Sequence, residues 1–161
     1  MIKLKPITWD NLNEIKALET HEHQKKFLIP IVEGLAVAYI RWKVNGMQCF
    51  EYGIYNDDMP IGYVQMEYTP AEKSELIDNK AYYMIWDFMI DKNHQGQGLG
   101  RAAMVAIIEH LKTEPEGTAD YIVTYYVSEN VVVAKLFESF GFEDIGERSL
   151  DGDIFVSLKV K

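Results

Sequence analysis

The segment Gln95–Arg101 holds three glycines at alternate positions, between an apolar strand and an apolar helix. The strand is predicted over 81–90, where Asp87 is the one charged residue, and the helix over about 99–111. Glycine has no Cβ, so backbone N–H groups can converge there, and the start of a helix carries about half a positive charge. This segment therefore predicts a site for a phosphate or pyrophosphate group.

Two familiar nucleotide-binding motifs with such glycines fit poorly. A P-loop requires Gly-Lys-Ser or Gly-Lys-Thr after the glycines, and neither follows here. Gly98, Gly100 and Ala103 match the dinucleotide-binding fingerprint only loosely, with Asp120 downstream. That fold would begin with this motif and continue through further βαβ units, whereas three antiparallel strands are predicted before it and one βαβ unit after it. A turn without a ligand would need fewer glycines, so another anion-binding fold is favoured.

The 161 residues suffice for one domain, 1–161. Before the segment above, the pattern predicts a strand over 2–6, a helix over 12–18 capped by Thr8 or Asp10, a helix over 24–43 that Pro30 bends or divides, and a hairpin over 48–55 and 61–69. After it come a strand over 121–127, a helix over 130–140 and two strands around Asp151-Gly152. The predicted fold class is α/β (α+β), a single mixed, mostly antiparallel sheet flanked by helices.

Charge and composition exclude several classes of function. Acidic residues outnumber basic ones 25 to 16, a net charge of -9, which disfavours nucleic acid as a partner and suits cationic small molecules. Cys49 is the only cysteine, so no intrachain disulfide or cysteine-rich zinc site forms, and His21 and His23 lack metal-ligand spacing. The longest apolar stretch, 27–39, is interrupted well short of the roughly 20 residues of a membrane span. We expect a cytoplasmic protein with no metal and no membrane partner.

Two motifs carry a family resemblance. Gln95-Gly96-Gln97-Gly98-Leu99-Gly100 resembles the acetyl-CoA motif of the GCN5-related N-acetyltransferases, the GNAT family, and the segment 130–142 is similar to that family's Asn-x(3)-Ala-x-x-Leu-Tyr-x-x-x-Gly-Phe signature. The predicted element order resembles the family fold along the whole chain. Trp86–Asp91 is most similar to the diamine and polyamine acetyltransferase branch. The resemblance implies transfer of acetyl from acetyl-CoA to a primary amine, with a small cationic amine such as a polyamine as the leading acceptor, and a homodimer.

Other acceptors and a second class of function stay open. An aminoglycoside, an amino-acid derivative or a protein N-terminus would use the same machinery. Phe137 stands where many members carry a tyrosine that protonates the leaving thiolate, so a non-catalytic acyl-CoA-binding sensor is the second interpretation. A thiol has a pKa of about 8.5, so transfer can proceed without that acid. Tyr125, Tyr126 or Ser139 could replace it, and Tyr126 is the candidate named here.

The resemblance also implies the residues of the acetyl-CoA site. The pyrophosphate would accept hydrogen bonds from the backbone of Gln95, Gly96, Gln97, Gly98, Leu99, Gly100 and Arg101. The pantetheine would run along Phe88, Met89 and Ile90, where the backbone N–H of Met89 or Ile90 would stabilise the oxyanion. Asn130 would contact the cofactor arm or cap a helix, Arg101 would add a charge, and Phe137 would pack against the cofactor or the core.

The acceptor side rests on acidic residues. An alkylammonium group has a pKa of about 10.4 and must lose a proton before it attacks. Asp87 is the candidate base, because a lone charge in a buried strand is costly without a partner or a role, and the alternative is a hydrogen-bonded structural carboxylate. Glu51 and Glu67 on the predicted hairpin are, with Asp87, candidates for holding a cationic group of the substrate, the alternative for both being solvated strand residues.

Overall fold

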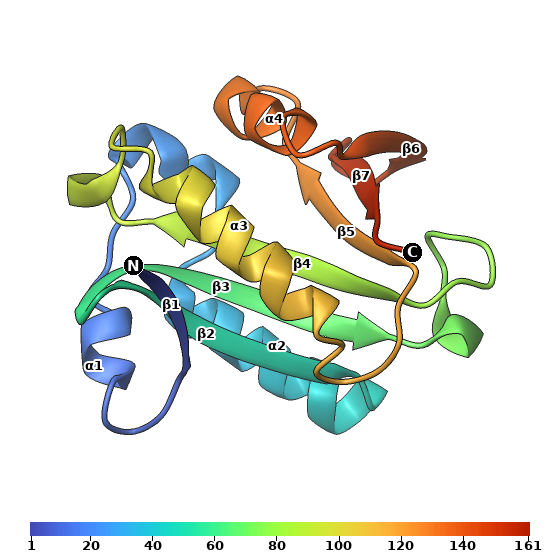
Figure 1. The fold of residues 1–161 in the computed structure, drawn as a ribbon, viewed down its shortest axis with the longest axis horizontal. Coiled ribbons are helices and arrows are strands. Elements are labelled where there is room, and N and C mark those ends of the chain that lie inside the picture. The colour runs from blue at the N-terminus through green and yellow to red at the C-terminus, as the bar shows by residue number, and fades with distance from the viewer.

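A computed structural model describes residues 1–161, and one seven-stranded sheet with the order β1-β2-β3-β4-β5-β7-β6 runs through it (Figure 1). The strands are β1 (Ile2–Pro6), β2 (Gln48–Asn56), β3 (Met59–Thr69), β4 (Tyr82–Ile90), β5 (Tyr121–Tyr126), β6 (Glu143–Arg148) and β7 (Ile154–Lys159). The helices are α1 (Leu12–Ile15), α2 (Ile31–Asn45), α3 (Leu99–Lys112) and α4 (Val131–Glu138). Short 3-10 turns cover Glu22–Phe27, Ala71–Lys73 and Lys92–His94.

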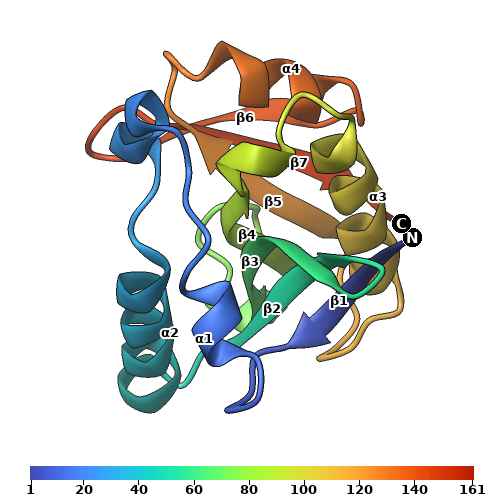
Figure 2. The ribbon, with the colours of Figure 1, turned by 90° about the vertical axis from the view of Figure 1, so that its left-hand side faces the viewer.

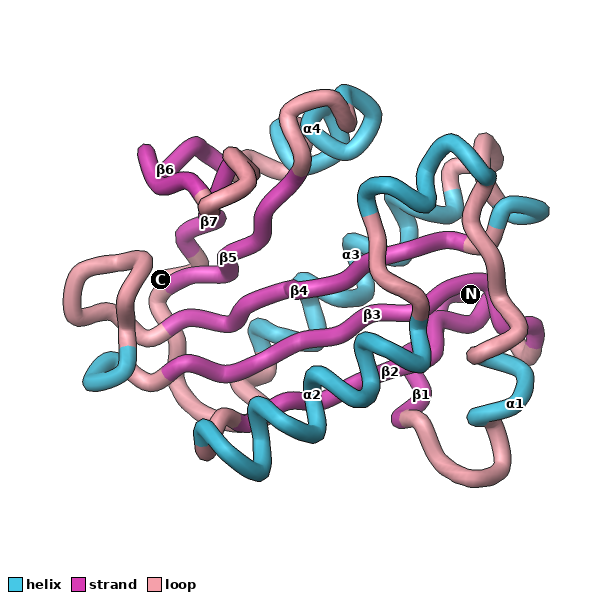
Figure 3. The backbone as a smooth tube through the Cα atoms, turned by 180° about the vertical axis from the view of Figure 1, so that it is seen from behind, coloured by secondary structure: helices cyan, strands magenta, loops and turns pink.

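The predicted architecture is confirmed. Neighbouring strands are antiparallel throughout except β4 and β5, which run parallel. Helices α1 and α2 lie on one face of the sheet and α3 on the other (Figure 2). Helix α2 packs against β2 and β3, as the view from behind shows (Figure 3). No helix combines the length and hydrophobicity needed to cross a membrane.

The largest apolar cluster fills the space between α3 and the sheet. Helix α3 contributes one buried stripe to it: Ala103, Met104, Ile107, Ile108 and Leu111. The sheet contributes alternate residues, such as Val64 and Met66 of β3, because successive strand side chains point to opposite faces. This packing fixes the axis of α3 and thereby holds its glycine-rich start next to the end of β4.

Pro30 divides the helix that was predicted over 24–43. A 3-10 turn covers Glu22–Phe27, the chain is extended at Leu28, and α2 begins at Ile31 directly after the proline. Proline is tolerated only at the start of a helix, because it lacks the N–H that an inner turn requires. The region before α2 is therefore a separate segment, free to contact the glycine loop.

The helix predicted over 12–18 is shorter than expected, and its predicted caps are wrong. Helix α1 covers only Leu12–Ile15, and its N-cap is Asn11. The Asn11 side chain accepts a hydrogen bond from the backbone N–H of Thr8. Asn11 also donates to the carbonyl of Pro6, so it ties the helix start to the end of β1.

Strands β4 and β5 separate half-way along. Their register stops at the pair Ile85–Thr124. At the same level Met66 of β3 pairs with Ile85 while Gln65 pairs with Asp87, so Trp86 is the extra residue of a β-bulge. A bulge bends its strand, and β4 runs toward α3 while β5 runs toward α4 (Figure 1). The second half of β4 thus has no partner on its β5 side.

Candidate active site

The space between the separated strands is a cavity of about 530 Å³. Four stretches of chain line it: the end of β4, the glycine loop, the end of β5 with the start of α4, and the segment before α2. The lining includes Trp86, Phe88, Met89, Ile90, Gln95, Gly96, Gly100, Tyr125, Tyr126, Asn130 and Phe137. Most of the residues expected to bind acetyl-CoA therefore meet at one cavity, whereas Gln97, Gly98, Leu99 and Arg101 do not line it.

The glycine loop presents free hydrogen-bond donors. Gly96 and Gly98 have φ angles of 73° and 77°, and a Cβ added to either would find nothing within 4 Å. None of the seven backbone N–H groups of residues 95–101 donates to another atom of the chain. The first turn of α3 always leaves such donors, but here the loop before it adds more. Together with the helix dipole they form a cradle for an anion.

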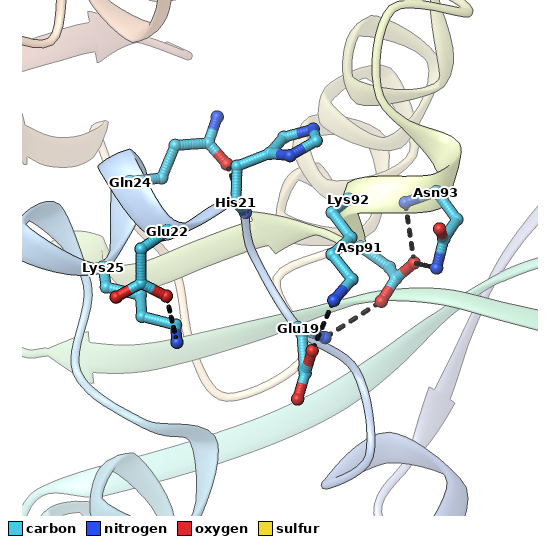
Figure 4. Close-up of polar contacts among 8 residues, drawn as sticks. All are labelled: Glu19, His21, Glu22, Gln24, Lys25, Asp91, Lys92 and Asn93. Carbon is cyan, nitrogen blue, oxygen red and sulfur yellow. Dashed lines mark hydrogen bonds and ion pairs between the residues drawn. The ribbon is translucent and has the colours of Figure 1, made fainter.

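The loop is anchored by Asp91 at the end of β4 (Figure 4). The Asp91 carboxylate accepts hydrogen bonds from the backbone N–H of Glu19, at 2.9 Å, and of Asn93, at 2.9 Å. Burial alone would raise the pKa of Asp91, but these N–H donors hold it below its usual value. Lys92 adds an ion pair with Glu19 at 2.6 Å. The residues before α2 and the glycine loop are thereby tied together.

A second tie joins the same two segments. Gln24 and Gln95 exchange two amide hydrogen bonds of 2.9 Å each, and the Gln95 amide also donates to the carbonyl of Ile90 at 2.8 Å. The side chain of Gln95 thus holds the glycine loop to the segment before α2, and only its backbone N–H is free to bind a ligand.

Two of the expected cofactor contacts are engaged within the chain. Arg101 donates to Ser139 Oγ at 2.6 Å and lies over the ring of Phe140, so it joins α3 to the end of α4. Arg101 does not line the cavity, so the expectation that it adds a charge to the cofactor site stays a prediction. Asn130 caps α4 through its Oδ1, which accepts from the N–H of Val133, while its amide nitrogen has no partner and lies at the cavity.

The orientation of the β4 backbone distinguishes the two expected oxyanion donors. The N–H of Asp91 donates to Ile61 on β3. Successive N–H groups of a strand point to opposite sides, so the N–H of Met89 points to β3 as well. The N–H of Ile90 points the other way, into the gap where β5 no longer pairs. Of the two candidates, Ile90 presents its donor to the cavity.

Asp87 is buried under α2 and does not line the cavity itself. It is 8% exposed, and burial raises its pKa to about 6. Its cross-strand neighbour is Gln65, whose own neighbour on β2 is Glu51, so three polar residues form one row across the sheet. Burial raises the pKa of Glu51 too. Trp86, the residue before Asp87, and Phe88, the residue after it, both line the cavity.

Glu67 is buried and paired within the chain. Arg41 of α2 binds its carboxylate through two hydrogen bonds, of 2.5 and 2.9 Å, and Glu67 is 1% exposed. Burial and the Glu67 charge raise the pKa of Cys49, which donates to the same carboxylate, to about 12. The Glu67 carboxylate is thus already paired with the Arg41 cation, and the expectation that it holds a substrate cation gains no support from this placement. Arg41 also lies 4.3 Å from the ring centroid of Trp86 and so supports the cavity wall.

The candidates for a general acid differ in position. Tyr125 and Tyr126 line the cavity, whereas Ser139 lies at the end of α4, where it donates to the carbonyl of Leu136 and accepts from Arg101. The rings of Tyr126 and Phe137 lie near each other, with centroids 6.4 Å apart and planes tilted by 49°. Burial first, and the charge of Asp87 second, raise the pKa of Tyr125 to about 12. Ser139 is thus removed from the candidates, and Tyr126 is the phenol nearest the expected position of the acid.

Sequence reasoning missed Arg41, Tyr63 and Gln65. Tyr63 and Gln65 are 2% and 1% exposed on the α2 side of β3, beside Asp87. A signal was available, because Gln65 and Glu67 alternate with apolar residues in a strand that is otherwise buried. The sequence around Arg41 carries no signal of its role, since its partner Glu67 lies 26 positions away.

The comparisons with known proteins agree with this geometry. The model of the acetyltransferase (GNAT) family matches residues 11–142. The chain belongs to the GNAT family. This GNAT-family N-acetyltransferase is 28% identical to the spermine/spermidine N(1)-acetyltransferase of Bacillus subtilis (strain 168) and to a probable spermine N(1)-acetyltransferase of B. subtilis subsp. natto, each over 94% of both chains. Its fold resembles aminoglycoside acetyltransferase AAC(6')-Ib in complex with coenzyme A and kanamycin, with a TM-score of 0.73 and 21% identity over 99% of this chain and 95% of that one.

Asp87→Asn should stabilise this acetyltransferase at alkaline pH. Burial places the folded-state pKa of about 6 above the ordinary 3.8, so ionisation destabilises the fold above pH 6 and this penalty is mostly lost near pH 4. The variant should exceed the wild type in free energy of unfolding by on the order of 3 kcal/mol at pH 8 and by less than about 1 kcal/mol near pH 4. Urea unfolding at both pH values measures this. An equal difference at the two pH values would show that ionisation is not its cause.

Proposed function

We propose that this GNAT-family enzyme transfers the acetyl group of acetyl-CoA to a primary amine, with a small cationic amine such as a polyamine as the leading acceptor. The observation that carries the proposal is the row of seven unpaired N–H groups at residues 95–101, next to the cavity between β4 and β5. The polyamine acceptor is supported by the names of the two Bacillus relatives and by the buried carboxylates. A homodimer and a cytoplasmic location stay predictions.

The donor site follows from the placement of the free backbone groups. The N–H groups of Gln95, Gly96, Gln97, Gly98, Leu99, Gly100 and Arg101 would bind the pyrophosphate. Such local dipoles explain how a chain of net charge -9 binds a polyanion, because dispersed surface charge is screened over about 10 Å. The pantetheine would take the place of the missing strand along Phe88, Met89 and Ile90, with the amide of Asn130 on its other side.

The reaction is a direct transfer. The ammonium gives one proton to the Asp87 carboxylate, and the freed lone pair attacks the thioester carbonyl carbon. The backbone N–H of Ile90 stabilises the oxyanion. As the C–N bond completes, the C–S bond breaks, and the second amine proton neutralises the sulfur by way of the Tyr126 hydroxyl. The amide leaves, coenzyme A leaves as the thiol, and the proton on Asp87 passes to solvent.

The acceptor site is negatively charged. Asp87 and Glu51 have no Lys or Arg partner in this chain, whereas Glu67 is neutralised by Arg41. Two uncompensated carboxylates in one row of the sheet would attract a cationic amine. Asp87 would meet the reacting amino group and Glu51 would add attraction from the same row of the sheet.

A thiol-release assay with acetyl-CoA tests the proposal. Spermidine, spermine, putrescine, a lysine peptide, an aminoglycoside and a peptide with a free N-terminus are compared at equal concentration. Release should be fastest with the polyamines. Release with other amines alone would keep the transferase and reject the polyamine, and calorimetric binding of acetyl-CoA without any release would support the sensor interpretation. Absence of acetyl-CoA binding would reject the whole proposal.

Asp87→Asn should lower kcat/KM for the amine by about 10²- to 10⁴-fold, because a general base contributes that much. In the wild type kcat/KM should rise with pH through about 6, the pKa to which burial raises Asp87. That limb should be absent in the variant, whose rate rises only as the amine itself deprotonates near its own pKa of about 10.4. Glu51→Gln is the matched control and should keep the limb near pH 6. A limb that survives in Asp87→Asn would assign it to another group.

Tyr126→Phe should lower kcat by about 10- to 100-fold with little change in the KM for either substrate, because a proton donor acts only as the thiolate leaves. Phe137→Tyr in the same chain should restore part of the rate, since the two rings lie near each other at the cavity, with centroids 6.4 Å apart. Steady-state kinetics of the single and double variants measure this. Full activity of Tyr126→Phe would show that the thiolate leaves without an acid.

A further inference from the structure

Two buried oxygen atoms near Asp87 have no hydrogen-bond partner. They are the hydroxyl of Tyr63 and the side-chain carbonyl of Gln65, both on the α2 side of β3. Their residues are 2% and 1% exposed, so bulk water does not reach them. An unpaired buried polar atom destabilises a fold, and natural proteins keep few of them. A partner that is not part of this chain would explain why these two are kept.

These atoms converge with the Asp87 carboxylate on one place. A Cβ on Gly34 of α2 would lie 3.2 Å from Gln65 Oε1, 3.4 Å from Asp87 Oδ2 and 3.4 Å from the Tyr63 hydroxyl. Three oxygen atoms from two strands therefore face the same point of α2. Only glycine at position 34 leaves that point without a side chain.

The cluster holds acceptors and negative charge without a cation. Gln65 lies in register with Glu51 on one side and with Asp87 on the other, and neither carboxylate has an ion-pair partner. Burial and then the charges of Glu51 and Asp87 raise the pKa of Tyr63, so its hydroxyl stays protonated. Arg41 of α2 is bound to Glu67. The ligand that would satisfy this cluster is a small positively charged group with several hydrogen-bond donors.

A primary ammonium group has this chemistry, because it carries one positive charge and three N–H donors on one nitrogen. We propose that Tyr63, Gln65 and Asp87 form the receptor for the primary ammonium of the acceptor, one oxygen for each N–H. The inference rests on the proposed function and names its selectivity: a primary amine is preferred over its N-methylated forms. The ammonium would have to reach the cluster from the cavity past residues close to Asp87 that line it, such as Trp86 and Met89.

Binding can be measured without acetyl transfer. Calorimetry follows n-butylammonium and its N-methyl, N,N-dimethyl and N,N,N-trimethyl forms on the full chain, with and without coenzyme A. In the wild type each N–H replaced by methyl should weaken binding about tenfold, as for a hydrogen bond to a charged group. In Tyr63→Phe and Gln65→Leu the primary amine should bind about tenfold more weakly and the differences within the series should shrink. Met66→Leu, on the opposite face of β3, is the control and should keep the wild-type series.

Thermal unfolding of the same proteins separates a receptor from a structural cluster. Tyr63→Phe and Gln65→Leu should melt at the wild-type temperature or above it, because each removes an unpaired polar atom. Tyr83→Phe should melt lower, since the equally buried Tyr83 hydroxyl donates to the carbonyl of Gly117 at 2.7 Å. A fall in Tyr63→Phe as large as that in Tyr83→Phe would overturn the proposal, because the hydroxyl would then have a partner within the chain.

Two further results would overturn the inference. One is equal binding of primary and trimethylated butylammonium by the wild type, and the other is an unchanged series in both variants. These outcomes are independent of the proposed function. Thiol release with amines whose KM is the same in Tyr63→Phe and wild type would retain the transferase and reject the receptor. Selective binding of primary ammonium without any release would reject the transferase and retain the receptor.

Discussion

The separation of β4 from β5 is the feature on which the rest of the site depends. Pairing ends at Ile85–Thr124, where the bulge at Trp86 bends β4. From there on β4 exposes backbone groups that a continuous sheet would have paired, and an unpaired strand edge is a template for an extended ligand. The same bend brings the end of β4 to the glycine loop. One irregularity in one strand therefore creates both the cavity and its proximity to the free N–H groups.

The bulge also determines which side chains of β4 lie on the α2 face of the sheet. Because Trp86 is an extra residue, Asp87 lies on the α2 face beside Gln65 rather than on the α3 face with Ile85. That face carries polar side chains on three strands. Some of them have hydrogen-bond or ion-pair partners within the chain and others have none. Glu67 is satisfied by Arg41, Cys49 and Thr69, whereas Asp87, Tyr63 and Gln65 are left with raised pKa values or unpaired atoms. Apolar residues of similar shape at Asp87, Tyr63 and Gln65 would make the fold more stable, so stability alone does not explain why polar residues stand there.

Local signals in the sequence predicted most of the fold. Hydrophobic period, Pro30 and the glycines gave the order of elements, and the position of the glycine loop between a buried strand and a helix gave the anion cradle. These features depend on residues close in sequence. The fate of Glu67 could not be predicted this way, because whether a strand carboxylate is free depends on a cation from another element, here Arg41. Arg101 and Ser139 are likewise paired with each other across 38 positions of the sequence.

The segment before α2 connects the glycine loop with the helix that covers Asp87. It is tied to the glycine loop by Asp91, Lys92 and the Gln24–Gln95 amide pair, and it continues through Pro30 into α2, the helix whose Gly34 lies over Asp87. The N–H groups of the loop are themselves free, so an anion bound there is added to this frame without breaking it. A shift of the loop would be transmitted along the segment to the helix above the carboxylate. Under the proposed function, the ties would hold the N–H groups that bind acetyl-CoA at a set distance from Asp87, and a direct transfer requires its reacting groups to be held in place.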